Sequence, residues 1–185
     1  MINDLLRETE IRMKKGIASL EDDFRSLRTG RASPALVERV MVDYYGAPTP
    51  LKQLAVISAP EPQMLLIRPY DPSSIKDIEK AILQADLGLN PSNDGHVIRV
   101  PIPRLTEERR RDMVKLVKRR VEDAKVTLRN IRRDALADMR SFEDEKLISE
   151  DDLKRGQDDL QKLTDRFTDA VSEIGDRKEQ EIMTI

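Results

Sequence analysis

The sequence contains no cysteine and no tryptophan, and aromatic residues make up only 3% of its 185 residues. Without cysteine, disulfide bonds, cysteine-ligated zinc, iron–sulfur clusters and thiol catalysis are excluded. The core must be mainly aliphatic, since 38% of the residues are hydrophobic. No apolar run approaches the roughly 18 residues of a membrane span. The early acidic residues Asp4 and Glu8 argue against a signal or transit peptide. We therefore expect a cytoplasmic protein with no membrane partner.

Proline is absent from both ends of the chain, because all ten prolines lie between Pro34 and Pro103. A proline inside a helix costs about 3 kcal/mol, so the ends can form long helices and the middle cannot. We therefore predict an α+β fold. An elongated three-helix bundle is formed by residues 1–29 and 105–185, and residues 30–104 form an inserted small β/α/β domain.

Three segments carry the predicted bundle helices. The first covers residues 3–27, with apolar residues three or four positions apart from Met13 onward. The second begins after Thr106, a suitable N-cap residue. The third begins at Ser149, with Asp152 placed as the acid of a capping box. Its predicted apolar seam consists of Leu153, Leu160, Leu163, Phe167, Ala170 and Ile174.

The middle of the chain predicts short strands, because β-prone runs are separated by Pro, Gly and Asn turns. These strands cover residues 40–45, 55–58, 64–68 and 97–102. One helix interrupts them, with Ser74 as its expected N-cap and Gly88 as its C-terminal stop. The order of the strands in the sheet does not follow from these signals.

The chain passes between the two predicted domains twice, near residues 29–31 and near residues 103–106. The first crossing contains Thr29, Gly30 and Arg31, and the second contains Pro103, Arg104 and Leu105. Gly30 gives backbone freedom at one crossing, whereas Pro103 restricts the other. Composition alone favours ordinary boundary residues over the alternative, a two-stranded hinge.

The sequence gives little support for an enzyme. His96 is the only histidine and is expected in a strand after the turn at residues 93–95. No phosphate-binding glycine loop, serine nucleophile elbow or zinc motif is present. Carboxylates fall mainly on the solvent faces of helices, although a pair assembled from distant segments stays open. We therefore predict no catalytic residue, no metal site, no cofactor and no small-molecule substrate.

Charge is strongly segregated along a chain whose total charge is only −2. Residues 105–142 contain twelve Lys or Arg and seven Asp or Glu, whereas residues 143–185 contain seven and fourteen. At about 100° per residue, most of the basic side chains fall within an arc of about 100° beside the apolar seam. They are Arg111, Lys115, Lys118, Lys125, Arg129, Arg132, Arg133 and Arg140.

Two interpretations of this basic arc stand near parity. The basic side chains can pair with the acidic third helix inside the bundle, or they can form a surface that binds phosphates. Arg129, Arg132 and Arg133 project together because they are three or four residues apart. Arginine at these positions favours phosphate binding, since its planar fork suits phosphate oxygens. The low aromatic content favours recognition of folded RNA over base stacking along a single strand.

Several motifs resemble those of ribosome recycling factors. In chain order they are residues 28–34 (RTGRASP), 44–46 (YYG), 49–51 (TPL), 86–91 (DLGLNP), 98–101 (IRVP), 105–110 (LTEERR), 129–135 (RNIRRDA) and 148–152 (ISEDD). The resemblance spans essentially the whole chain, and together the motifs are highly specific. Ala85, where the family often has Ser, is a minor departure.

The resemblance implies a non-enzymatic translation factor with an L-shaped outline similar to that of transfer RNA. It implies binding in the A/P region of the post-termination ribosome and cooperation with elongation factor G. GTP hydrolysis by that partner then drives subunit dissociation and release from mRNA. The resemblance also implies that Arg129, Arg132 and Arg133 contact large-subunit ribosomal RNA. We add Lys118, Lys125 and Arg140 from the basic arc, and expect a monomer.

A rival interpretation is a coiled-coil adaptor that binds another protein through its acidic third helix. It predicts tight protein binding without ribosome association. An enzyme is the third and least favoured alternative.

Overall fold

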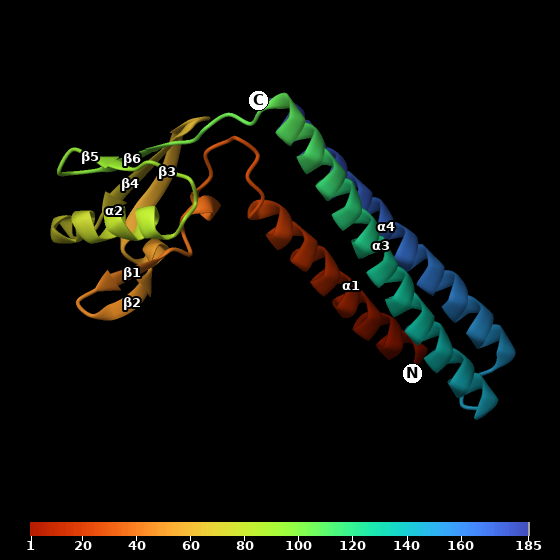
Figure 1. Cartoon of the computed structure of the whole chain (residues 1–185). Coiled ribbons are helices and arrows are strands. Elements are labelled where there is room, and N and C mark those ends of the chain that lie inside the picture. Colours follow the sequence, from red (N-terminus) through yellow and green to blue (C-terminus); the bar gives the residue numbers. More distant parts are fainter. Residues whose placement is uncertain (185) are drawn as a thin grey trace. The chain divides into compact units, whose positions relative to one another are not determined.

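The computed structural model describes residues 1–184 and contains two compact units, which we describe separately (Figure 1). The first unit consists of Met1–Arg25 and Arg111–Met183, and the second is built on Ser26–Arg110. The first is a helical bundle and the second contains the sheets, which confirms the predicted α+β fold class. Both predicted hinge segments, residues 29–31 and 103–106, lie within the second unit.

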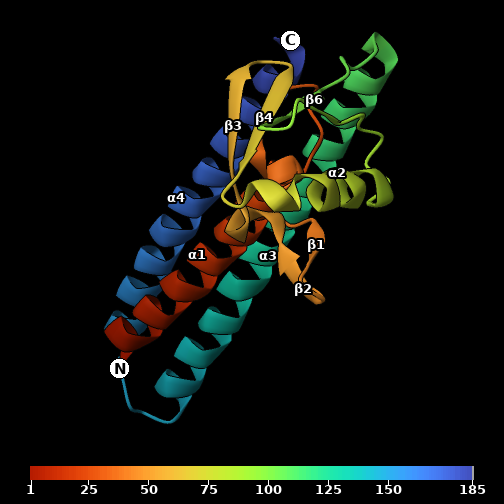
Figure 2. The same cartoon turned by 90° about the vertical axis from the view of Figure 1, so that its left-hand side faces the viewer.

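Three long helices make up the bundle and run side by side in both ribbon views (Figures 1 and 2). They are α1 (Ile2–Arg25), α3 (Glu107–Asp144) and α4 (Glu150–Met183). At 1.5 Å per residue, the 38 residues of α3 extend for about 57 Å. A helix of this length needs partners along its whole course, which α1 and α4 supply.

The predicted caps of α3 and α4 are confirmed. Thr106 Oγ1 accepts a hydrogen bond from the Arg109 amide at 3.2 Å. Ser149 Oγ accepts from the Asp152 amide at 3.0 Å, and Asp152 Oδ2 accepts from the Ser149 amide at 3.2 Å. Hydrogen bonds from the hydroxyl and the amide of Ser149 lower the pKa of the Asp152 carboxyl. The reciprocal pair is a capping box, which satisfies two amides that the helix itself leaves without partners.

Apolar seams bury the inner faces of the helices, largely as the spacing predicts. The fully or nearly buried seam residues of α1 and α3 are Met13, Leu20, Phe24, Val117, Leu128, Ile131, Ala135 and Met139. The predicted seam of α4 is only partly correct. Leu160 and Phe167 are buried, but the remaining buried positions of α4 are Gly156, Thr164, Val171, Gly175, Lys178 and Ile182.

Close helix packing explains why α4 buries two glycines that the predicted seam did not include. A Cβ atom added to Gly175 would lie 2.4 Å from Cγ2 of Val121 on α3. Gly156 is also tightly surrounded, with Ile2 and Met139 atoms 3.3 Å from its added Cβ position. Buried Thr164 satisfies its hydroxyl by donating to the Leu160 carbonyl at 2.8 Å. The buried seam of α4 therefore includes glycines and a threonine whose hydroxyl is hydrogen-bonded within the same helix.

The second unit contains two antiparallel sheets. Strands β1 (Met41–Tyr44) and β2 (Ala47–Pro50) form a hairpin. Strands β3 (Ala55–Glu61), β4 (Met64–Pro69), β5 (Ser92–Asn93) and β6 (Ile98–Pro101) form the larger sheet in the order β3-β4-β6-β5. Helix α2 (Ile75–Gln84) packs against β1. Short 3-10 helices cover Pro34–Leu36, Leu51–Gln53 and Pro72–Ser74.

Alternating side chains of the central strands build the core of this unit. Leu65 on β4 lies opposite Val100 on β6, and Ile67 lies opposite Ile98, with all four side chains fully buried. Ile78 and Ile82 of α2 belong to the same apolar cluster. The period of two in β4 and β6 thus directs one side of each strand into the core.

Five local features of this unit differ from the prediction, although Ser74 does occupy the N-cap position of α2. Strands β2 and β5 were missed, because β2 contains two prolines and β5 has only two residues. Ser74 does not cap α2 with its side chain, since its hydroxyl donates to the Asp71 carbonyl as part of the preceding 3-10 turn. Helix α2 ends before Gly88, and the first residue with a left-handed backbone is Asp86, at φ 53°. His96 lies in the turn between β5 and β6 and not in a strand.

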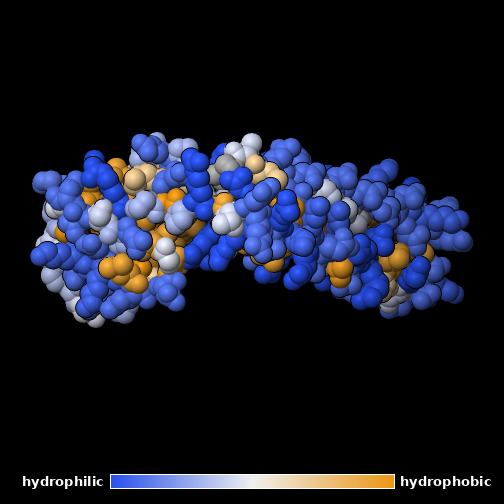
Figure 3. Space-filling model, turned by 45° about the horizontal axis from the view of Figure 1, so that its top comes forward, coloured by the Kyte–Doolittle hydropathy of each residue, from blue (hydrophilic) through white to orange (hydrophobic). Residues whose placement is uncertain are grey.

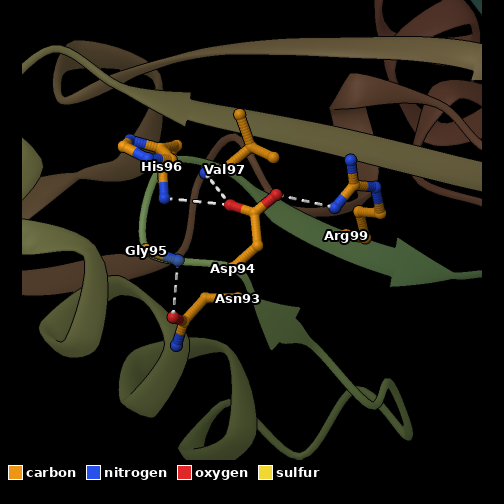
Figure 4. A network of polar contacts seen from close by, with 6 residues as sticks. All are labelled: Asn93, Asp94, Gly95, His96, Val97 and Arg99. Carbon is orange, nitrogen blue, oxygen red and sulfur yellow. Dashed lines mark hydrogen bonds and ion pairs between the residues drawn. The ribbon is translucent and has the colours of Figure 1, made fainter.

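Asp94 organises that turn through three hydrogen bonds (Figure 4). Its Oδ1 accepts from the amides of His96 and Val97, both at 2.9 Å, and its Oδ2 accepts from Arg99 Nη1 at 2.9 Å. The two amides, followed by the guanidinium, lower the pKa of the Asp94 carboxyl. His96 therefore contributes its backbone to a structural turn.

The Asp94 turn makes the inserted unit sensitive to acid. A carboxyl whose pKa is lower in the folded state stabilises the fold above its unfolded pKa of about 3.9. That stabilisation is lost as the pH falls below this value toward the folded-state pKa. We expect Asp94→Asn to flatten the decline of the unfolding midpoint between about pH 5 and pH 2. Asp43→Asn is the control, since the exposed Asp43 carboxyl makes no hydrogen bond or ion pair among residues 1–184, and it should keep the wild-type decline. Equal slopes for D94N and wild type would contradict the assignment.

Two glycine substitutions test the packing of the bundle. Gly175→Ala should lower the free energy of unfolding by about 1–3 kcal/mol, because the new methyl group overlaps Val121. Gly16→Ala on α1 is the matched control, since nothing lies within 4 Å of its added Cβ. There the better helix propensity of alanine should stabilise the bundle by about 0.5–1 kcal/mol. Chemical denaturation measures both values, and effects of the same sign would refute the packing argument.

Candidate nucleic-acid interface

The six predicted RNA-binding residues all lie on α3. Lys118, Arg129, Arg133 and Arg140 are exposed, and Lys125 and Arg132 are half-buried. We call these six residues the basic face. At about 100° per residue, the six positions fall within an arc of about 100°, so they lie on one side of the helix. The apolar seam of α3 occupies a different side of the helix, toward α1 and α4.

The acidic helix α4 does not neutralise the basic face. Arg129 Nη2 pairs with Glu122 Oε1 at 3.1 Å, within α3 itself. Arg132 Nη1 donates to Oε1 of the neutral Gln161 at 2.9 Å. The side chains of the other four members make no hydrogen bond or ion pair within residues 1–184. These members are Lys118, Lys125, Arg133 and Arg140.

The ion pairs that join the helices lie elsewhere. Arg12 on α1 pairs with Asp134 on α3 at 3.2 Å. Arg166 on α4 pairs with Glu10 on α1 at 2.6 Å, and this hydrogen bond lowers the pKa of Glu10. For the six residues of the basic face, pairing with the acidic third helix is therefore not what the bundle does. The basic face keeps most of its charge available to a partner.

An open hollow of about 480 Å³ lies beside the basic face, between α3 and α4. Arg129, Arg132, Arg133 and Arg140 line its α3 side. On the α4 side, Gln161 accepts from Arg132 and donates its own amide to Asp165 Oδ1 at 2.8 Å. Sequence patterns missed the α4 contribution, because isolated glutamines on a charged helix carry no recognisable signal.

The outer surface of the bundle is mainly polar on the side that Figure 3 displays. Hydrophilic residues cover most of this face of the helical unit, and hydrophobic residues appear only in small separate patches. On this face the bundle therefore offers charge to a partner and no broad apolar area.

The predicted hinge residues have contrasting environments within the second unit. Thr29 and Gly30 are buried, Leu105 is half-buried, and Arg31, Pro103 and Arg104 are exposed. Gly30 has φ +79°, and an added Cβ would lie 3.2 Å from the Leu105 amide nitrogen. The two crossing segments therefore contact each other at a position that favours glycine.

Both crossing segments are also anchored to one hairpin turn. The Ala32 amide donates to the Pro62 carbonyl at 2.7 Å, and the Ile102 amide donates to the Gln63 carbonyl at 2.8 Å. Pro62 and Gln63 connect β3 to β4. These two bonds fix Ala32 and Ile102 relative to the same turn.

Groups of three or more His, Asp or Glu side chains placed to hold a metal ion are not found among residues 1–184. None of the helices in this part of the chain has the length and apolar character needed to cross a membrane.

Comparison with known proteins identifies the family. The family model for ribosome recycling factor matches residues 20–183. The ribosome-recycling factors of Syntrophomonas wolfei and Chloroflexus aurantiacus are each 56% identical to this chain over 185 residues. Each alignment covers 100% of both proteins. The similarity therefore includes both units and the crossings between them.

Solved structures give the same result. A solution structure of a ribosome recycling factor has a TM-score of 0.78 and 44% identity, covering 100% of this chain and 98% of that one. A second structure contains T. thermophilus ribosome recycling factor and E. coli elongation factor G bound to the E. coli post-termination complex. Its match has a TM-score of 0.69 and 44% identity, and covers 99% of each chain.

Fold and relatives together define a non-enzymatic translation factor. The chain belongs to the ribosome recycling factor family. This membership decides against the coiled-coil adaptor and the enzyme considered from the sequence.

Proposed function

We propose that this protein binds the post-termination ribosome through the basic face of α3 and, together with elongation factor G, separates the subunits and releases the mRNA. The observation that carries the proposal is that four of the six basic side chains have no partner within residues 1–184, although an acidic helix is adjacent. Unpaired arginines and lysines along one side of a long helix are suited to the phosphates of folded RNA. A relative bound with elongation factor G to a post-termination complex supports the same function.

The ligand of the basic face is large-subunit ribosomal RNA in the A/P region. Arginine is the appropriate residue because its planar fork can donate two hydrogen bonds to one phosphate. The protein acts as a cytoplasmic monomer and needs no cofactor. The L-shaped outline and its similarity to transfer RNA stay predictions.

The mechanism is mechanical and makes no covalent bond. The bundle is stiff, because three helices share a continuous apolar seam over much of the length of α3. The inserted unit receives a push from elongation factor G, whose GTP hydrolysis supplies the energy. Thr29, Gly30 and Arg31 on one crossing, and Pro103, Arg104 and Leu105 on the other, form the hinge. The anchored bundle transmits the resulting force to contacts between the subunits.

Sedimentation with ribosomes tests this function. The protein should pellet with post-termination ribosomes, and elongation factor G with GTP should convert those ribosomes into separate subunits. Neither factor alone should do so at the same concentration. Ribosomes that stay intact with both factors, or a protein that stays in the supernatant, would contradict the proposal.

Replacing one arginine should change both the affinity and its salt dependence. Arg132→Ala should weaken ribosome binding by about 1–3 kcal/mol and reduce the slope of log K against log [salt] by about one. Arg177→Ala is the control, since this exposed arginine of α4 pairs only with Glu173 among residues 1–184. R177A should bind like wild type in a filter-binding titration across salt concentrations. If the slope of log K against log [salt] is unchanged in R132A, Arg132 does not contact a phosphate.

Replacing the hinge glycine should separate binding from recycling. Gly30→Val places a branched side chain at φ +79° and against Leu105, so the crossing becomes strained and crowded. We expect ribosome affinity within about twofold of wild type and subunit separation slowed at least tenfold. Gly16→Val at a helix position with open space is the comparison for a glycine change alone. Equal losses of affinity and recycling in G30V would contradict the hinge.

A further inference from the structure

The hollow between α3 and α4 is larger and chemically richer than a phosphate site requires. The four oxygens of a phosphate, each taken as about the 30 Å³ of a liquid water, fill roughly a quarter of 480 Å³. The volume lies within the range of about 300–1,000 Å³ that is typical of pockets for whole small molecules. The arginines alone therefore do not account for the hollow.

Its floor is apolar. Leu160 of α4 is only 2% exposed and belongs to the buried cluster with Ala135 and Met139. Leu136 of α3 is half-buried and packs on the same cluster. A flat, uncharged ring can rest on such a floor, whereas a phosphate gains nothing from it.

Its walls carry amides that the fold leaves unused. Asn130 of α3 and Gln157 of α4 both line the hollow, and neither side chain makes a hydrogen bond within residues 1–184. Asparagine and glutamine amides can donate and accept at once, which suits the edge of a nucleobase. Gln161 differs from them, because its carbonyl orients Arg132 and its amino group is held by Asp165.

We propose that this hollow binds one unpaired ribonucleotide of the RNA that the basic face contacts, with the phosphate on the arginines of α3 and the base edge on Asn130 and Gln157. The ring rests on the leucine floor beside a guanidinium plane, which takes the place of an aromatic side chain, since none lines the hollow. The nucleotide must be unpaired, since only a base that has left its stack can lie flat on the floor and present its edge to Asn130 and Gln157. Gln161 is a positioning residue for Arg132. This inference rests on the proposed function of the basic face and adds the class of nucleotide that it recognises.

Neutral substitutions separate base recognition from phosphate binding. Gln157→Leu replaces the amide side chain with an apolar side chain of similar size and leaves the net charge unchanged. It should raise the Kd for ribosomes about tenfold and leave the salt slope unchanged, because no counterion-releasing charge is lost. Asn130→Ala, an exposed change that leaves the seam intact, should act in the same direction. Gln84→Leu on α2 is the matched amide control and should bind like wild type.

Chemical probing of ribosomal RNA identifies the nucleotide directly. Wild-type protein should shield at least one unpaired base from base-specific modification. Q157L, added at saturating concentration, should restore reactivity at that base while backbone protection beside it persists. Unfolding midpoints for Q157L and N130A within about 2 °C of wild type exclude a folding defect.

The possible outcomes distinguish the two proposals. If Q157L and N130A bind as tightly as wild type, or if the wild type shields no unpaired base, the proposal that the hollow binds a nucleotide is wrong. In that case a retained effect of R132A leaves the basic face as a phosphate-binding surface. If R132A also binds like wild type, the basic face is not the RNA contact, and both proposals fail together.

Discussion

The packing of α3 against α1 and α4 determines which of its side chains a binding partner can reach. Leu128, Ile131 and Ala135 bury one side of α3, and this burial fixes which side remains outside. Four of the six cations on that outer side have no partner within residues 1–184, and Arg132 bonds to a neutral amide. A helix with the same charges but a shifted seam would bring them against α4, where they would pair with its carboxylates. The affinity for an anionic partner thus depends on the register of an apolar seam.

The same packing gives the bundle its stiffness. Gly175 and Gly156 allow the backbone of α4 to approach its neighbours closely, which leaves little room for relative movement. The crossings of the inserted unit are different. Their hydrogen bonds to Pro62 and Gln63 hold one end of each crossing, and Gly30 supplies a backbone conformation that other residues avoid. This contrast supports the proposal that relative movement takes place at the crossings and not within the bundle.

Much of this architecture follows from the sequence. Proline distribution predicts the α+β division, and the caps at Thr106 and Ser149 set the starts of α3 and α4. The seam of α4 was partly missed, because glycine and threonine are buried there for reasons of backbone distance that hydrophobicity does not encode. Strand β5 was missed because two residues carry no periodicity.

The basic face was placed correctly on α3, but its freedom from ion pairs depends on side-chain contacts. The amides of the hollow come from two segments about 27 residues apart in sequence, Asn130 and Gln157, which only the folded chain brings together.

The central claim is that the basic face of α3 lies against ribosomal RNA, and directed hydroxyl-radical cleavage tests it most directly. The chain has no cysteine, so a single introduced cysteine carries an iron chelate at one known place. Ala137→Cys puts it on α3 beside the basic face, and Ala18→Cys puts it on the exposed side of α1. The account predicts strong cleavage of large-subunit RNA from A137C and weak cleavage from A18C. Equal cleavage from both positions, or stronger cleavage from A18C, would contradict it.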